Sequence, residues 1–149
     1  MNQEIVQGVI FTEELTQSIV SKQNITVVLG ASPNPVRFSC KAVKSLMKRG
    51  KKVVAVGFRE EPIIYEGEDH ATEILIRKGM PHIEDVDTVS IYIGSSRQEP
   101  YYDYVFSLNP RRVIFNPGTV NPAFMGQLSI KGIEVLNECM LVMLREGNY

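Results

Sequence analysis

The sequence predicts an α/β fold: a Rossmann-like, doubly wound and mostly parallel sheet of about five strands, with helices on both faces. Three observations lead to this prediction. Short β-branched apolar runs recur along the chain, each run ends at a glycine or a polar turn, and helical patterns separate the runs. Continuous apolar runs are typical of strands buried on both faces of a parallel sheet. Their alternation with helices implies right-handed crossovers.

The first half of the chain contains the clearest elements. A strand over 25–29 ends at Gly30, and a turn-rich stretch over 31–35 follows. A helix with one apolar face follows. It ends at Gly50, because glycine commonly terminates helices. A second strand occupies 52–57. Pro62, Gly67 and many acidic residues predict a loop or a short helix over 59–72, and 73–77 fits either a short strand or part of a helix.

The second half repeats the alternation. Residues 81–85 predict a connector, and 88–93 a strand that ends at Gly94. A helix follows over 99–108, with Tyr101, Tyr104, Val105 and Leu108 inward. The pattern then predicts a strand over 112–115, a helix over 121–131 that stops at Gly132, and a last strand over 133–136. Residues 139–144 are apolar but fit no single element type.

Length and composition indicate one globular domain. The chain has 149 residues, of which 44% are hydrophobic and 22% charged, which is ordinary for a folded domain of this size. Residues 1–23 stand apart from the alternating pattern. We interpret them as an N-terminal extension with a short helix that opens at Thr12, and residues 24–149 as the single Rossmann-like domain.

Composition also excludes several functional classes. A net charge of −1 disfavours a broad nucleic-acid-binding face, and no apolar run approaches the roughly 18 residues of a membrane span. Cys40 and Cys139 cannot build a disulfide framework, so we expect a reduced, cytoplasmic protein with both cysteines in the core. The spacing of His70 and His82 matches no metal site.

The turn after the first strand is the candidate site. It leads from a buried strand into a helix, whose free backbone N–H groups and dipole attract anions. Ser39, or Asn34 followed by Pro35, could cap this helix, and we prefer Ser39 because the apolar periodicity begins at Cys40. Arg37 then lies just before the helix start, where a cation is unfavourable unless an anion lies beside it. We therefore expect a phosphate-bearing ligand here.

Two sequence tests narrow the choice of ligand. The dinucleotide fingerprint G-x-G-x-x-G fails because Ser32 and Pro35 occupy its second and third glycine positions, and the P-loop motif is absent. At the end of the second strand, where enzymes that use NAD place an acidic residue, this chain has Arg59. An arginine suits a phosphorylated ribose, as in NADP or coenzyme A.

These residues also carry a family resemblance. The segment 27–46, with Gly30-Ala31-Ser32, Arg37 and Ser39, resembles the CoA-binding domain family, the small bacterial proteins similar to the N-terminal domain of the succinyl-CoA synthetase α subunit. The resemblance extends over about 24–145. It implies pyrophosphate over Ala31, Ser32, Arg37 and Ser39, and adenosine near 57–59, with the turns 93–95 and 116–118 lining the crevice. The expected cofactor-binding residues are Gly30, Ala31, Ser32, Arg37, Phe38, Ser39, Gly57, Phe58, Arg59, Gly94, Ser95, Asn116, Pro117 and Gly118.

The sequence thus favours non-catalytic binding of coenzyme A or an acyl-CoA, rather than an enzyme. Two alternatives stay open: an NADP-binding oxidoreductase or epimerase relative, and an interaction domain with a vestigial nucleotide cleft. The chain contains no Tyr-x-x-x-Lys pair, which argues against the first. We expect no nucleic-acid or membrane partner. The aromatic cluster Tyr101, Tyr102, Tyr104 and Phe106 suits core packing and a subunit contact, so a homodimer is also expected.

Overall fold

The computed structural model describes residues 24–149, which form a main sheet of six parallel strands. Across the sheet these are β5 (Arg77–Lys78), β2 (Val53–Gly57), β1 (Ile25–Ala31), β6 (Val86–Ile91), β7 (Arg112–Phe115) and β8 (Glu134–Leu136). Numbered along the chain within this sheet, the order is 3-2-1-4-5-6, the doubly wound Rossmann order. The predicted fold class is confirmed, with one strand more than expected. The extension predicted over 1–23 lies outside the described residues.

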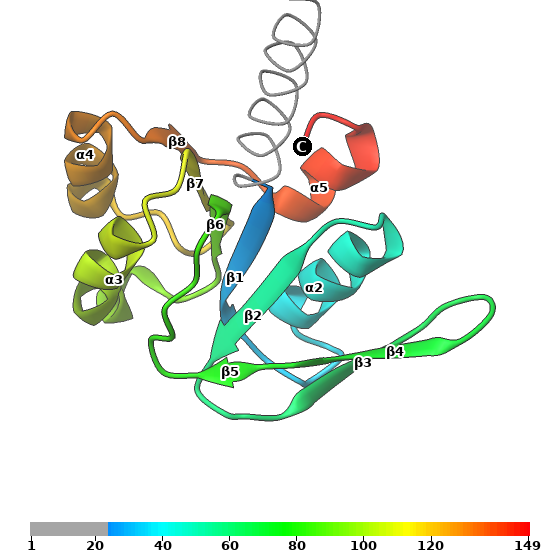
Figure 1. The fold of residues 1–149 in the computed structure, drawn as a ribbon. Coiled ribbons are helices and arrows are strands. Elements are labelled where there is room, and N and C mark those ends of the chain that lie inside the picture. The colour runs from blue at the N-terminus through cyan, green and yellow to red at the C-terminus, as the bar shows by residue number, and fades with distance from the viewer. Residues whose placement is uncertain (1–23) are drawn as a thin grey trace, which may run out of the picture.

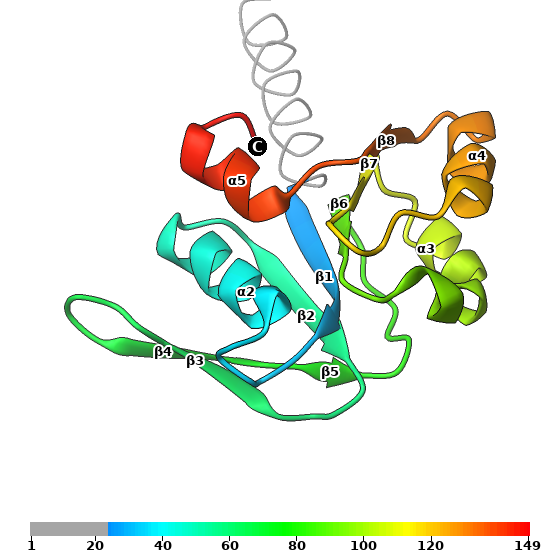
Figure 2. The ribbon, with the colours of Figure 1, turned by 180° about the vertical axis from the view of Figure 1, so that it is seen from behind.

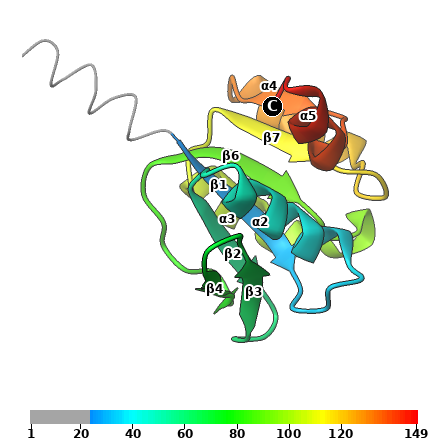
Figure 3. The ribbon, with the colours of Figure 1, turned by 90° about the vertical axis from the view of Figure 1, so that its right-hand side faces the viewer.

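Helices cover both faces of this sheet, as predicted. One face carries α2 (Phe38–Lys48) and α5 (Met140–Glu146), and the other carries α3 (Tyr102–Ser107) and α4 (Pro122–Ile130) (Figures 1 and 3). Two buried clusters correspond to these faces: Cys40, Leu46 and Met140 belong to one, and Tyr104 and Phe124 to the other. The apolar segment at 139–144 is helix α5. Within residues 24–149, no helix has the length and apolar character needed to cross a bilayer.

The stretch over 59–72 is where the sequence interpretation was wrong. It forms neither a loop nor a helix but an antiparallel hairpin of β3 (Pro62–Glu66) and β4 (Ala71–Leu75), which projects from the body of the molecule (Figures 1 and 2). Ile63 pairs with Ile74 across the hairpin, and Ile63 is only 1% exposed because it packs in the α2 cluster. Contact with α2 thus orders a segment whose composition resembles a loop.

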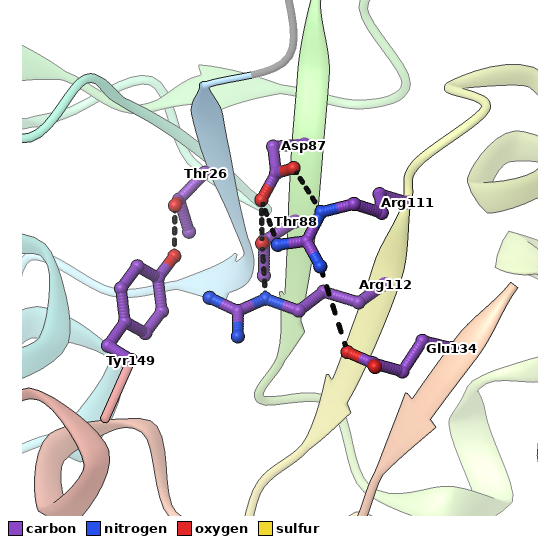
Figure 4. A network of polar contacts seen from close by, with 7 residues as sticks. All are labelled: Thr26, Asp87, Thr88, Arg111, Arg112, Glu134 and Tyr149. Atoms are coloured by element: carbon purple, nitrogen blue, oxygen red, sulfur yellow. Dashed lines mark hydrogen bonds and ion pairs between the residues drawn. The ribbon is translucent and has the colours of Figure 1, made fainter. Parts of the chain in front are cut away.

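A polar network joins the amino ends of four strands (Figure 4). Asp87 accepts two hydrogen bonds from Arg111, at 2.7 and 3.0 Å, and a third from the hydroxyl of Thr88. Arg112 donates from Nε to the Thr88 hydroxyl at 2.8 Å, and its guanidinium lies 4.4 Å from the ring centroid of Tyr149. Thr26 and Tyr149 are hydrogen-bonded, and Glu134 lies near Arg111. These contacts fasten the sheet at the edge opposite the carboxyl ends of its strands.

Candidate functional site

A cavity of about 470 Å³ opens at the carboxyl ends of β1, β2 and β6. Its size is typical of sites for small molecules and cofactors. The chain leaves β1 toward β2 on one side and returns to β6 on the other, so the cavity lies at the topological switch point, where doubly wound sheets bind ligands. The lining residues are Gly30, Ala31, Ser32, Pro33, Asn34, Arg37, Phe38, Ser39, Phe58, Arg59, Tyr92, Ile93 and Arg97.

Gly30 brings the first turn close to the chain that follows β6. Its φ of 95° lies in the left-handed region, and the register of β1 against β2 shifts between Leu29 and Ala31. A Cβ at this position would lie 2.9 Å from Cγ1 of Ile93 and 3.0 Å from the backbone carbon of Tyr92. Both the conformation and the close approach therefore require glycine.

The start of α2 differs from the sequence prediction. The helix begins at Phe38, and Arg37 is its N-cap residue, without a side-chain cap hydrogen bond. Ser39 lies buried in the first turn, so the prediction of Ser39 as the cap was wrong. Asn34 is not the cap either: its side-chain oxygen accepts from the backbone N–H of Val36 at 3.0 Å and shapes the preceding loop.

The consequence for the site is electrostatic. No acidic residue stands in the first turn of α2, and no side chain caps it, so the positive end of the helix faces the cavity without a compensating protein anion. A bound anion would meet backbone N–H groups that the helix itself does not use.

Three arginines add positive charge to the same cavity: Arg37, Arg59 and Arg97. Arg59 lies 3.7 Å from Glu61, an exposed ion pair of the kind that contributes little in water. Among residues 24–149, neither Arg37 nor Arg97 forms an ion pair. The cavity thus presents cationic groups that a multiply charged anion would neutralise.

Two phenylalanines give the walls of the cavity exposed aromatic surface. Phe58 is 54% exposed, and its ring meets the edge of Tyr101 at a centroid distance of 6.4 Å. Phe38 is 67% exposed, with the ammonium of Lys41 5.3 Å from its ring centroid. Aromatic rings that remain exposed at a cavity offer flat surfaces on which a planar base can stack.

Not every predicted residue lines the cavity. Gly57, Gly94, Ser95, Asn116, Pro117 and Gly118 lie outside the lining. Gly57 acts through packing, because a Cβ there would lie 2.3 Å from the carbonyl oxygen of Ala31. Asn116 is buried: its amide donates to the Ser90 hydroxyl and to the Ile91 carbonyl at 2.8 and 2.9 Å, and its side-chain oxygen accepts from the N–H of Met140. These bonds commit its side chain to the fold.

Ile93, which belongs to the turn 93–95 that the resemblance placed at the crevice, does line the cavity, and so do Pro33, Asn34, Tyr92 and Arg97, which the sequence did not assign to the site. Pro33 and Asn34 belong to the turn that the sequence singled out, so their position in that turn was an available signal. Tyr92 and Ile93 read as strand residues in the sequence, whereas β6 ends at Ile91. Arg97 is the third residue after Gly94. The fold of this loop brings it to the cavity, and the sequence pattern does not reveal that fold.

Burial disfavours ionisation of two side chains at or beside the cavity, the thiol of Cys40 and the phenol of Tyr92. Cys40 is buried, its thiol lies 3.9 Å from the carbonyl oxygen of Pro33, and burial raises its pKa, which is the environment of a structural cysteine. Burial also raises the pKa of the Tyr92 phenol. Within the described part of the chain, no three His, Cys, Asp or Glu side chains gather as a metal site.

Comparisons with known proteins show which fold and which family the chain shares. Solved structures with the same fold include a crystal structure of an uncharacterized protein, 37% identical over 85% of this chain and 98% of that one, with a TM-score of 0.76. Two others are cell-free ID.343 from Thermus thermophilus, 22% identical over 91% of this chain and 98% of that one, with a TM-score of 0.69, and a hypothetical protein from Pyrococcus horikoshii OT3, 21% identical over 90% and 89%, with a TM-score of 0.66.

No curated protein matches the chain significantly. A family model does: residues 24–145 match the model described as the CoA binding domain. This range covers the sheet, the whole lining of the cavity and the helices, except for the last residue of α5. The resemblance expected from the first turn is thereby confirmed, and the chain belongs to the CoA-binding domain family.

Proposed function

We propose that this protein binds coenzyme A or an acyl-CoA in the cavity at the carboxyl ends of β1, β2 and β6, without catalysing a reaction on it. One observation carries the proposal: the uncapped start of α2 and three arginines face one cavity at the switch point of the sheet. Family membership supports coenzyme A as the ligand. In this proposal the pyrophosphate lies over Ala31, Ser32 and Arg37 at the start of α2.

The adenosine end would then lie toward β2. Phe58 supplies a surface for the base, and Arg59 supplies a cation for the phosphate on the ribose, which distinguishes coenzyme A from NAD. The same arginine would suit NADP, so NADP belongs in any ligand test. The buried thiol of Cys40 supports a binding role rather than nucleophilic chemistry in this cavity.

Calorimetry and thermal unfolding with coenzyme A, acetyl-CoA, NADP and NAD test the proposal. A ligand at 100 times its Kd should add about 2.7 kcal/mol to the free energy of unfolding. We expect this gain with the two CoA species and none with NAD. A gain with NADP alone would favour the oxidoreductase relative. No gain with either CoA species would sink the proposal and leave an interaction domain with a vestigial cleft.

Fluorescence can place the ligand. The chain contains no tryptophan, so Phe58→Trp introduces a single reporter at the cavity wall. Stacking of adenine on this indole should quench its emission as coenzyme A is added. Ile130→Trp, at an exposed position on α4 outside the cavity lining, is the matched control and should not respond. Equal quenching of both variants would contradict binding at this cavity.

A further inference from the structure

Arg97 reaches the cavity from the wall that follows β6. It ends a short 3-10 turn, Ser95–Arg97, which precedes a second one, Glu99–Tyr101. The backbone N–H of Arg97 donates to the carbonyl of Gly94 at 2.9 Å. The side chain is exposed, and within residues 24–149 it has no carboxylate partner. An exposed arginine on a surface turn can adopt many directions, so something else must fix the turn if Arg97 is to meet a ligand.

The next residue supplies that anchor. Gln98 is only 1% exposed, although its neighbours Arg97 and Glu99 are exposed. Its side-chain nitrogen donates to the carbonyl oxygens of Ile93 at 2.8 Å and Thr119 at 2.7 Å. Its side-chain oxygen accepts from the amide of Asn121 at 3.1 Å. A buried amide is costly unless its bonds are made, so these three contacts hold Gln98, and with it the backbone of Arg97, in one place.

The same contacts connect two loops. Ile93 follows β6 and lines the cavity, whereas Thr119 and Asn121 follow β7. The hydroxyl of Thr119 donates to the carbonyl of Asn116 at 2.7 Å, and the Asn121 amide also donates to the hydroxyl of Tyr102 at 2.8 Å. The loop after β7 therefore supports the cavity through Gln98, without lining it.

The strand order indicates which part of a ligand Arg97 can reach. β1 lies between β2 and β6, so the segment with Arg59 follows one neighbour of β1, the segment with Arg97 follows the other, and the turn with Arg37 follows β1 itself. Two strand spacings separate β2 from β6, or about 10 Å. Arg97 therefore approaches the centre of the cavity from the side opposite to Arg59, across from the start of α2.

We propose that Arg97 determines specificity for the diphosphate of the ligand by binding it opposite Arg37, and that Gln98 is the positioning residue of Arg97. This inference rests on the proposed function. It assigns the three arginines to two anionic centres: Arg37 and Arg97 to the diphosphate, and Arg59 to the phosphate on the ribose. The preferred ligands accordingly carry both a diphosphate and a phosphate on the ribose.

Paired ligands separate the two centres. Coenzyme A and dephospho-CoA share the diphosphate and differ in the ribose phosphate. Arg97→Gln should weaken both by the same factor, about 10- to 150-fold for a charge-assisted contact. Arg59→Gln should lower the affinity for coenzyme A and leave the affinity for dephospho-CoA unchanged. If the natural chain binds neither, the proposed function fails. If it binds coenzyme A and Arg97→Gln does not alter the affinity, only the inference about Arg97 fails.

A double-mutant cycle tests the positioning role. Gln98→Met keeps the size of the side chain and removes its three hydrogen bonds, so the affinity for coenzyme A should fall about tenfold in the natural background and little in the Arg97→Gln background. Gln127→Met, an exposed glutamine on α4, is the matched control and should change neither value. Equal losses in both backgrounds would show that Gln98 does not act through Arg97.

A second variant covers the case in which Gln98→Met does not fold. The side-chain oxygen of Asn121 caps α4 by accepting from the N–H of Phe124, a role that serine can also fill. Asn121→Ser therefore keeps a cap and removes the amide bonded to Gln98. It should lower the affinity for coenzyme A by about threefold, and again only while Arg97 is present. The same loss without Arg97 would overturn the positioning role.

Discussion

Arg37 stands at a position that is unfavourable for the folded protein alone. It is the N-cap residue of α2, where the helix dipole is positive, and it forms no ion pair within the described residues. A cation at a helix N-terminus costs about 0.3–1 kcal/mol. A phosphate between the guanidinium and the first turn would reverse the sign of this contribution. Arg37 therefore destabilises α2 when no ligand is bound, and it would stabilise α2 when a phosphate is bound.

Arg37→Ala tests this coupling. Without ligand, the free energy of unfolding should stay the same or rise by up to about 1 kcal/mol, because an unfavourable charge is removed. The affinity for coenzyme A should fall by about 1.5–3 kcal/mol, because a charge-assisted contact is lost. Urea unfolding and calorimetry measure the two quantities. Arg145→Ala, an exposed arginine on α5, is the control, and an equal affinity loss there would remove Arg37 from the site.

Single site residues were predictable where a residue with suitable chemistry lies next to the end of a predicted strand or helix. Gly30, Arg37 and Phe58 lie next to the ends of predicted elements, and the structure places all three at the cavity. Arg97 was not predictable in this way, because its side chain reaches the cavity through a 3-10 turn held by the long-range bond from Gln98 to Thr119. The cap of α2 was misassigned because apolar periodicity locates the buried face of a helix and not its first residue.

At the scale of elements, the carboxyl ends of β1 and β2 lie so close together that position 57 has no room for a side chain. Gly57 closes β2 beside Ala31, and the register between these strands shifts at this point. A Cβ at Gly57 would lie 2.3 Å from the Ala31 carbonyl oxygen, a backbone atom that cannot move alone. Because Ala31 lines the cavity, the same packing shapes the proposed pyrophosphate site.

Gly57→Ala should therefore destabilise the fold by about 1–3 kcal/mol, the usual cost of local overpacking. It should also lower the affinity for coenzyme A. Gly126→Ala is the matched control. Gly126 lies within α4 with open space around it, so alanine there should stabilise by about 0.5–1 kcal/mol. Neither glycine has a positive φ, so the contrast isolates packing. Urea unfolding of both variants measures it, and equal effects would contradict the steric argument.

Elements with their own apolar pattern were predictable, and those ordered by contacts were not. The patterns predicted β1, β2, β7 and α2 near their observed positions because each buries a periodic set of side chains. The β3–β4 hairpin lacks such a set, since most of its residues are exposed, and Ile63 alone is buried in it. A single buried residue leaves no periodicity to recognise.

For the whole molecule, the amino ends and the carboxyl ends of the strands form two edges of the sheet with different roles. The amino edge holds the network of Figure 4, which links β1, β6, β7 and β8 through side chains. The carboxyl edge carries the cavity and its cations. A change in the network at the amino edge should therefore alter the stability of the fold and leave ligand binding unchanged, and pH offers one way to test this.

Asp87 predicts how acid affects the fold. Burial alone would raise the pKa of its carboxyl, but the hydrogen bonds from Arg111 and Thr88, together with the charges of Arg111 and Arg112, outweigh burial and lower this pKa. A carboxyl with a lowered folded-state pKa stabilises the protein above its unfolded value of about 3.9 and loses that contribution as pH falls through the folded value. Asp87→Asn should therefore reduce stability at neutral pH and flatten its decline below about pH 4.

Urea unfolding from pH 7 to pH 2.5 measures this effect. Asp103→Asn, an exposed aspartate on α3, is the control and should leave the acid-side decline in place. Calorimetry at neutral pH should find the same affinity for coenzyme A in Asp87→Asn as in the natural chain, because Asp87 lies at the opposite edge of the sheet. An unchanged acid-side decline in Asp87→Asn would contradict a role for this carboxyl in stability.

The last prediction concerns the boundary of the domain. The family match begins at residue 24, just before β1, and its range contains the buried residues of both core clusters and the lining of the cavity. A chain of residues 24–149 should therefore unfold in one cooperative urea transition and bind coenzyme A within about threefold of the full chain, since both buried clusters of the described residues and the cavity lining are retained. A broad transition or lost binding in the shortened chain would instead assign residues 1–23 to the folded domain.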